Sequence, residues 1–212
     1  AVTLQTAFAL SCNTAFVEMS EQLGADELRK YAKAFGVGEN YDLGVSTSAG
    51  TLGDLPDGAA TAQSAIGQRD VTMTALQAAV MAGTVANKGT RMQPYLVNRI
   101  TDAQMKDVRT TKPKKADQAV NEETAATLTD LMYASERSSW GYDGNGFASK
   151  TGTAEHSDGA APHAWFTGFA PADNPKIAVA VVVEDGGRAG NEAYGGSVAG
   201  PISSAALQAI LQ

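Results

Sequence analysis

In the first two thirds of the chain, apolar residues recur at the three- and four-residue spacing of amphipathic helices. Gly24, Gly36 and Gly89 follow three of these patterns, in the position where a left-handed residue commonly ends a helix. Asn121 precedes two glutamates, so it is expected to cap a helix whose first turn carries favourable negative charge. The pattern predicts helices over residues 3–10, 14–23, 25–35, 72–88 and 121–137.

The pattern changes in the last third, where short β-branched and aromatic runs are separated by turns. Strands are predicted over 147–155, 164–170 and 177–184, and the turn at 171–175 is short enough for an antiparallel hairpin. A glycine-rich loop at 186–196 then leads to a last helix over 198–211. Helices followed by antiparallel strands predict a mixed α and β fold. Residues 1–146 form its mainly helical part and residues 147–212 its strands and C-terminal helix, with no boundary between independent domains.

Two segments lack a clear period. Residues 36–68 are rich in Gly, Ser, Thr and Asp, which predicts a long ordered loop of the kind that often lines a functional site. Residues 95–100 are consistent with a short strand. Residues 101–118 carry many lysines and arginines and are interpreted as a solvated connector.

Composition narrows the range of possible functions. The 212 residues are 43% hydrophobic and 18% charged, which fits a packed core, and the net charge of -7 disfavours a nucleic acid as partner. The single cysteine, Cys12, excludes an internal disulfide and is expected to pack inward. No apolar run reaches the roughly 18 residues of a membrane-spanning helix. The first residues have the pattern of a helix interior, so we expect that the chain begins in mid-fold.

Two short motifs carry candidate chemistry: Ser11-Cys12-Asn13, in a loop between predicted helices, and Lys150-Thr151-Gly152-Thr153, on the first predicted strand of the last third. Each is weak alone. A Ser-x-Asn string before a helix is usually a capping arrangement, and a Lys-Thr-Gly string is often an exposed strand with a glycine bulge. Together they match two of the three motifs of β-lactamases and penicillin-binding proteins.

The residue types suit acyl transfer. A hydroxyl such as that of Ser11 relays a proton when an amine lies within hydrogen-bond reach, and Asn13 both donates to and accepts from a peptide amide. Lys150 supplies positive charge for a substrate carboxylate. Thr151 and Thr153 offer hydroxyls to the same carboxylate, and Gly152 lets substrate approach the strand. Because Lys150 and Thr151 point to opposite faces of a strand, both serve one site only along the strand edge.

The remaining candidates are interpreted as structural. His156 and His163 have no cysteine or carboxylate at metal spacing, so no metal site is predicted. Trp165 and Phe166 are expected in the core, with a cleft position as the alternative for Trp165. For Tyr194, in the glycine-rich loop, a cleft position is likewise the alternative. No cofactor is predicted.

Further short strings are spread over nearly the whole chain: Ser64–Gln68, Val71–Gln77, Ala86–Gly89 with Pro94, Lys150–Glu155 and His163–Pro171. With these strings the sequence resembles class B penicillin-binding proteins, and most closely the monofunctional actinobacterial type. Ala75 stands where these proteins commonly have proline, and Arg69-Asp70 replaces a usual glycine; neither change touches the chemistry.

The resemblance implies the C-terminal part of one transpeptidase domain, with a serine β-lactamase/transpeptidase-like fold in which helices flank an antiparallel sheet. It implies a D,D-transpeptidase that cross-links peptidoglycan stem peptides ending in D-Ala-D-Ala and that β-lactams acylate. By analogy, Ser11 shuttles protons, Asn13 orients substrate, Lys150 supplies charge, and the backbone N–H of Thr153 forms half the oxyanion hole. It also implies a role in cell shape and division, at the outer face of the bacterial membrane, alongside partners such as a glycosyltransferase.

The family's nucleophile motif is missing, because no serine in the chain has a lysine three residues later. Family members place this Ser-x-x-Lys upstream, together with the first strands of the sheet and the membrane anchor. We therefore expect that the fold is completed by an N-terminal segment of the same protein. Alone, the chain is expected neither to catalyse transfer nor to bind penicillin covalently.

Two alternatives remain open. A class A serine β-lactamase needs a deacylating glutamate with asparagine four residues on, and no glutamate here has that neighbour. A non-catalytic β-lactam sensor or scaffold domain would keep partner binding after Lys150→Ala, whereas an enzyme would lose activity.

Overall fold

The computed structural model describes residues 2–139, 142–157 and 159–212. Its first three helices confirm the predictions: α1 spans Leu4–Ala9, α2 Asn13–Leu23 and α3 Ala25–Ala34. The Thr3 hydroxyl caps α1 by accepting a hydrogen bond from the Thr6 backbone N–H at 3.1 Å. Gly24 and Gly36 adopt positive φ angles of 79° and 97°, as expected for residues that end helices.

The long loop predicted at 36–68 is interrupted by a helix, α4, at Gly58–Ala65. Asp57 caps it, since its Oδ1 accepts from the Ala60 N–H at 2.8 Å. The prediction missed α4 because alanine, glycine and threonine dominate it and no apolar period marks it. Gln77 holds two points of the remaining loop, because its buried side-chain amide donates to the carbonyls of Glu39 and Ala49.

Gln77 also belongs to α5, which spans Ala75–Ala86 and begins three residues later than predicted. Thr74 sets this boundary through a capping box, in which its hydroxyl accepts from the Gln77 N–H and the Gln77 side chain accepts from the Thr74 N–H.

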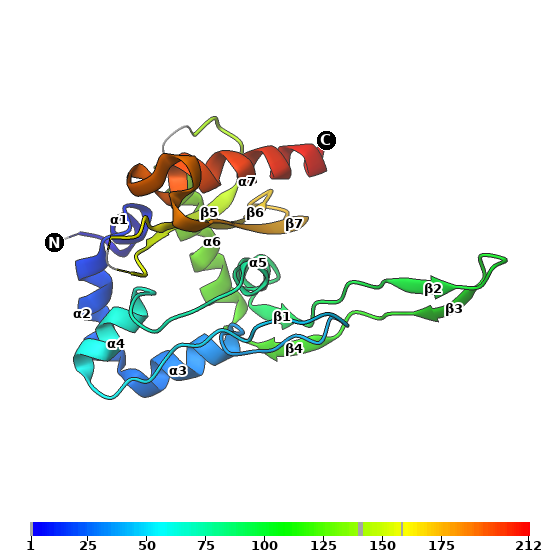
Figure 1. Cartoon of the computed structure of the whole chain (residues 1–212), viewed down its shortest axis with the longest axis horizontal. Helices are drawn as coiled ribbons and strands as arrows, with labels where there is room; N and C mark the ends of the chain where they lie inside the picture. Colours follow the sequence, from blue (N-terminus) through cyan, green and yellow to red (C-terminus); the bar gives the residue numbers. More distant parts are fainter. Residues whose placement is uncertain (1, 140–141, 158) are drawn as a thin grey trace.

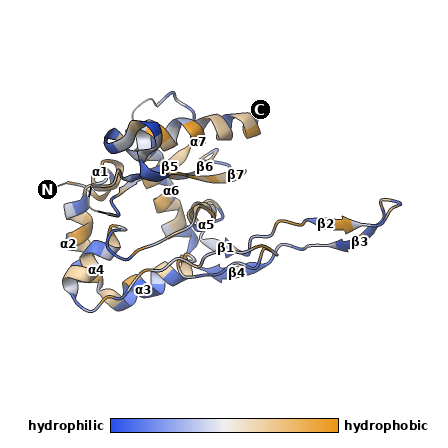
Figure 2. Cartoon of the chain, in the orientation of Figure 1, coloured by the Kyte–Doolittle hydropathy of each residue, from blue (hydrophilic) through white to orange (hydrophobic). Residues whose placement is uncertain are grey.

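Residues 101–118 are solvated, as predicted, but they also contain strands that were not predicted. Together with residues 90–101 they form an arm of two small antiparallel sheets: β1 (Thr90–Met92) pairs with β4 (Lys115–Gln118), and β2 (Arg99–Thr101) pairs with β3 (Asp107–Thr110). Figure 1 shows this arm projecting from the body, and Figure 2 shows β2 more hydrophobic than β3. The strand expected at 95–100 lies at 99–101. All of β3 and β4 is exposed. Because neither strand has a buried face, the sequence lacks the alternation of apolar and polar residues that marks a strand.

The body of the molecule is a three-stranded antiparallel sheet in the order β5-β6-β7, with strands at Ala148–Ala154, His163–Ala170 and Ile177–Val183. Helices α5 and α6 (Glu122–Arg137) cover one face, where Met132 packs against Phe169. Helix α7 (Gly195–Leu211) covers the other, where Leu207 packs against Ala170. A kinked 3-10 segment, η1 (Glu184–Glu192), joins β7 to α7. Figure 1 shows α7 on the opposite side of the sheet from α5 and α6.

These elements confirm the mixed fold and the three predicted strands. Asn121 caps α6 as expected, its Oδ1 accepting from the Thr124 N–H at 2.8 Å. Among the described strands, β5 is an edge strand whose ladder partner is β6. Within the described ranges, every helix is too short or too polar to cross a bilayer.

Candidate active site

Ser11 lies in the tight turn between α1 and α2. The turn is closed by hydrogen bonds from the Cys12 N–H to the Ala7 carbonyl at 2.8 Å and from the Ser11 N–H to the Phe8 carbonyl at 3.2 Å. Ser11 itself has φ of 55°, in the left-handed region that residues with a side chain rarely adopt and that recurs at functional sites.

The capping interpretation of this motif is wrong. The N-cap of α2 is Cys12, which makes no side-chain cap hydrogen bond, and Asn13 is the first residue of the helix. The Ser11 and Asn13 side chains instead lie on the wall of a cleft. Both residues therefore border the cleft, and neither is the N-cap of the helix.

Lys150 reaches Ser11 across 139 residues of sequence. The Lys150 Nζ donates to Ser11 Oγ at 2.7 Å and to the Thr151 carbonyl at 2.9 Å, and lies 6.0 Å from the Phe8 ring centroid. Burial lowers the pKa of Lys150 from 10.5 to about 8, because the surrounding protein removes water from the ammonium. The predicted convergence of the two motifs on one groove is confirmed.

The cleft around this pair has a volume of about 670 Å³. The segment 36–68 reaches this cleft, because its last residues, Ala65 to Gln68, form part of the wall. Except for Trp165, for which a cleft position was the stated alternative, the apolar part of the wall was not foreseen, since nothing local in the sequence distinguishes these residues from core. It consists of Phe8, Phe16, Ile66, Val71, Met73, Ala78, Met81 and Trp165.

The other motif residues occupy the edge strand. Thr151, Gly152 and Thr153 all line the cleft and pair in register with Phe166, Trp165 and Ala164 of β6. Alternation turns Lys150 towards Ser11, while Thr151 also borders a second cavity of about 390 Å³ beside α7. The expected edge location of the site is thus confirmed.

Thr153 is held from the side of α7. Its Oγ1 accepts from the Gly195 N–H at 3.4 Å, so this hydroxyl also positions the start of the helix. A Cβ on Gly195 would overlap the Trp165 carbonyl and lie 2.7 Å from the Gly152 carbonyl. Only glycine lets α7 approach the motif strand this closely. That Thr151 and Thr153 bind one carboxylate stays a prediction.

A buried carboxylate is hydrogen-bonded to the motif strand, β5. Glu136, at the end of α6, is 6% exposed and accepts hydrogen bonds from the fully buried Ser149 hydroxyl and from Asn145 Nδ2, the latter at 3.2 Å. Ser149 immediately precedes Lys150, so Glu136 fixes the strand next to the candidate ammonium. The sequence gives no sign of this, because Glu136 lies in a charged stretch typical of a solvated helix end.

The residues that were interpreted as structural do not all take the predicted positions. Phe166 is core, at 4% exposed, as predicted, and Trp165 takes the alternative position on the cleft wall. Tyr194 is 45% exposed and is the N-cap residue of α7, and it does not line this cleft. Cys12 does not pack inward: it is half-exposed, and a hydrogen bond with the Thr14 hydroxyl lowers the pKa of its thiol.

The premise that the two histidines lack a carboxylate neighbour is also wrong. The fold brings Asp185 within 3.0 Å of His156 Nε2 and within 3.8 Å of His163 Nδ1. The sequence hid this contact because Asp185 lies more than 20 residues beyond either histidine.

Known proteins resemble this chain over almost its whole length. Residues 1–208 match the family model of the penicillin-binding protein transpeptidase domain. The chain belongs to this family. It is 46% identical to the peptidoglycan D,D-transpeptidase PbpA of Mycolicibacterium smegmatis and 42% identical to that of Mycobacterium tuberculosis, in each case over all of this chain and 44% of the relative.

The transpeptidase fold is also found in solved structures. A ceftriaxone acyl-enzyme complex of penicillin-binding protein A from M. tuberculosis matches all of this chain and 49% of its own, with 42% identity and a TM-score of 0.95. These findings confirm the resemblance to class B penicillin-binding proteins. The chain spans about half the length of the relatives it matches.

Proposed function

We propose that residues 1–212 form the substrate-binding and proton-relay part of a peptidoglycan D,D-transpeptidase, whose nucleophilic serine lies in polypeptide outside these residues. The observation that carries the proposal is the 2.7 Å contact between Lys150 Nζ and Ser11 Oγ on the wall of the cleft. It is supported by the names of the relatives, D,D-transpeptidases with β-lactam acyl-enzyme structures.

In the proposed reaction the serine oxygen attacks the carbonyl carbon between two D-alanines of a stem peptide. The C–N bond then breaks, D-Ala leaves with the serine proton, and an ester remains. The amine of a neighbouring strand attacks this ester, so that a new amide forms, the C–O bond breaks and the serine regains its proton. A β-lactam acylates the same serine as its ring opens.

Ser11 relays the proton between the serine and the leaving amine, because its hydroxyl both donates and accepts. Lys150 serves two purposes as an ammonium: it donates to Ser11 Oγ, and it attracts the terminal carboxylate of the peptide. This carboxylate leaves the site together with the terminal D-Ala. With a pKa of about 8, Lys150 is mostly charged at neutral pH.

The motif strand and the turn provide the remaining contacts. The substrate backbone pairs with the edge of β5 at Gly152, Asn13 holds a peptide amide, and the hydroxyls of Thr151 and Thr153 assist Lys150 at the carboxylate. The backbone N–H of Thr153 supplies one oxyanion-hole donor. Loss of one such donor typically costs about 3–4 kcal/mol of transition-state stabilisation.

The test is covalent labelling by a fluorescent penicillin of the protein in its full native length. Ser11→Ala and Lys150→Ala should each lower the labelling rate by about 10²- to 10⁴-fold, the usual contribution of a positioned proton-transfer group. Lys176→Ala is the matched control, since Lys176 is exposed on the β6–β7 turn and should leave the rate unchanged. Residues 1–212 alone should remain unlabelled.

The outcomes separate the alternatives. A long-lived penicillin adduct supports the transpeptidase, whereas rapid turnover of penicillin would indicate a β-lactamase. Unchanged labelling in Lys150→Ala, or labelling of residues 1–212 alone, would overturn the proposal. Labelling of intact cells by an impermeant penicillin tests the proposed extracytoplasmic location.

A further inference from the structure

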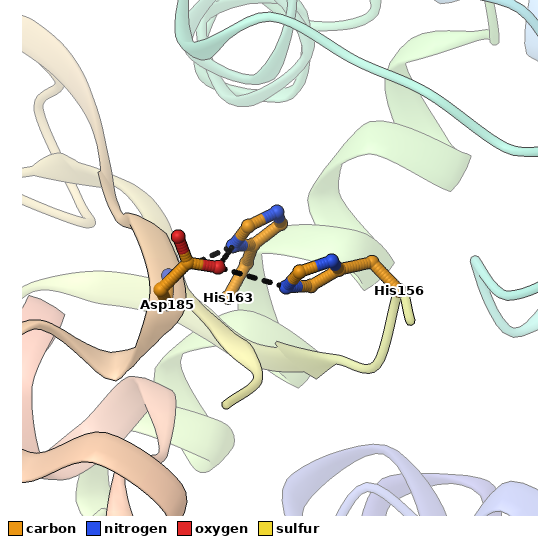
Figure 3. Close-up of side chains that lie close together, drawn as sticks. All are labelled: His156, His163 and Asp185. Carbon is orange, nitrogen blue, oxygen red and sulfur yellow. Dashed lines mark hydrogen bonds and ion pairs between the residues drawn. The ribbon is translucent and has the colours of Figure 1, made fainter. Parts of the chain in front are cut away.

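Three side chains meet at one end of the central sheet (Figure 3). His156 follows the end of β5, His163 begins β6, and Asp185 follows the end of β7. Because β5, β6 and β7 are antiparallel neighbours, the end of β5, the start of β6 and the end of β7 lie at the same edge of the sheet. The topology therefore imposes this proximity on residues far apart in sequence.

The two histidines direct ring nitrogens at one carboxylate oxygen. His156 Nε2 lies 3.0 Å and His163 Nδ1 3.8 Å from Asp185 Oδ1. The rings are stacked, with centroids 3.9 Å apart and planes 10° from parallel. One possible ligand atom from each of the three residues lies within 4.8 Å of the others, and solvent reaches all three side chains.

Hydrogen bonding leaves this cluster with more acceptors than donors. His163 Nδ1 accepts from the Asp185 backbone N–H at 3.0 Å, so the lone pair of Nδ1, and not a proton, faces the Asp185 side. Nδ1 and Asp185 Oδ1 are then two acceptors facing each other. His156 Nε2 can carry at most one N–H, whereas two acceptors, Asp185 Oδ1 and the Ala161 carbonyl, each lie 3.0 Å from it. Two imidazole nitrogens and a carboxylate oxygen that lie this close together are ligand atoms that one cation can bind.

The backbone around Asp185 is held in place. Asp185 has φ of 50°, a conformation that aspartate and asparagine tolerate better than most residues. The following Gly186 is buried, and a Cβ there would come 2.9 Å from the Ala193 Cβ. The carboxylate is therefore presented by a constrained turn rather than by a loose loop.

We propose that His156, His163 and Asp185 bind a divalent transition-metal ion of the zinc type. Two imidazoles and one carboxylate are a ligand set that zinc uses, with bonds of about 2.0–2.2 Å and a fourth position open to water. Such bonds separate ligand atoms by about 3.3 Å, so small rotations of these solvent-accessible side chains suffice. The ion replaces the Asp185 N–H as the partner of His163 Nδ1. Magnesium and calcium, which prefer oxygen ligands, do not compete.

The site is coupled to the candidate active site through β5. A bound ion ties the end of the strand that carries Lys150 and Thr153 to the starts of β6 and η1. It acts as a clamp on this end of the sheet. Hydrogen exchange of backbone amides at 154–157 should therefore slow when the ion binds.

The experiment is Zn²⁺ titration of the tag-free protein in its full native length, in competition with a chromophoric chelator. One equivalent of Zn²⁺ should bind, Co²⁺ should give a visible absorption band on binding, and excess Mg²⁺ should displace neither. His156→Gln, His163→Gln and Asp185→Asn should each weaken Zn²⁺ binding by more than the roughly 10- to 100-fold that loss of an outer-shell partner causes. Asparagine is chosen because it tolerates the left-handed backbone.

Two control variants should bind Zn²⁺ normally: Glu184→Gln, which removes the adjacent negative charge, and Cys12→Ser, which removes the one thiol of residues 1–212. Zn²⁺ should also raise the melting temperature of the wild type, as any ligand of the native state does, but not that of Asp185→Asn. Absence of stoichiometric binding, retention of binding in Asp185→Asn, or its loss in Cys12→Ser would overturn the proposal.

Discussion

The buried ammonium of Lys150 makes the native protein less stable than an apolar side chain would. Burial lowers the pKa of Lys150 from 10.5 to about 8, and this gap corresponds to about 3 kcal/mol. Between these two pH values the unfolded chain binds more protons than the native one, so stability rises as pH increases from 8 to 10.5. Below pH 8 the full penalty is present.

The perturbation that exposes this penalty is Lys150→Met, which keeps an unbranched chain of similar length without the charge. At pH 7 it removes the desolvation penalty but also two hydrogen bonds, to Ser11 and Thr151, each worth about 1 kcal/mol. The free energy of unfolding should therefore rise by about 1–2 kcal/mol. Urea denaturation of the protein in its full native length measures this change, and Lys176→Met, at an exposed position, should change it by less than about 0.5 kcal/mol.

The pH dependence of the gain is the decisive part. At pH 10.5 the wild-type Lys150 is already neutral in the native state, so the advantage of methionine should disappear. A gain that is equal at pH 7 and pH 10.5, or a loss of stability at pH 7, would refute the reasoning. Lys150→Met should also lose penicillin labelling, so that this one substitution raises stability and removes activity.

Three further predictions follow from the same structure. Penicillin acylation should fall as pH rises through about 8, because Lys150 loses its proton, and Lys150→Arg should remove this alkaline limb from the pH profile of the rate, since a guanidinium stays charged. Gly195→Ala should lower the free energy of unfolding by at least about 1–3 kcal/mol in thermal denaturation, because its Cβ would overlap the backbone of β5 and β6. Gly83→Ala in the interior of α5, where the nearest atom is the Ala178 Cβ at 3.7 Å, should instead raise it by about 0.5–1 kcal/mol. Glu136→Ala should cost about 1–3 kcal/mol by the same assay, since it leaves the buried Ser149 hydroxyl without its acceptor.

Much of the fold was predictable because its boundaries are set locally. Asn121 begins α6 and Gly36 follows α3 through caps and backbone preferences that are visible in the sequence. The arm was missed because both faces of β3 and β4 are solvated, and α4 because its small residues carry no apolar period.

The candidate site was also predictable only where a local motif marks its residues. Ser11 and Lys150 were found through short motifs, and the structure joins them. Glu136 beneath the motif strand and Asp185 beside the histidines depend on contacts between distant segments, which leave no local signal. The cleft wall was missed for a related reason: Phe8 and Met73 have the helical spacing and apolar character of core residues, and only the arrangement of the elements turns them towards a cleft.

The central claim is that Ser11 and Lys150 act as one unit, and a double-mutant cycle on the penicillin acylation rate tests it most directly. In the protein in its full native length, Ser11→Ala and Lys150→Ala should each slow acylation by about 10²- to 10⁴-fold. The double variant should be little slower than the slower single variant, because each group needs the other to move the proton. Effects that multiply, as for two independent residues, would contradict the account.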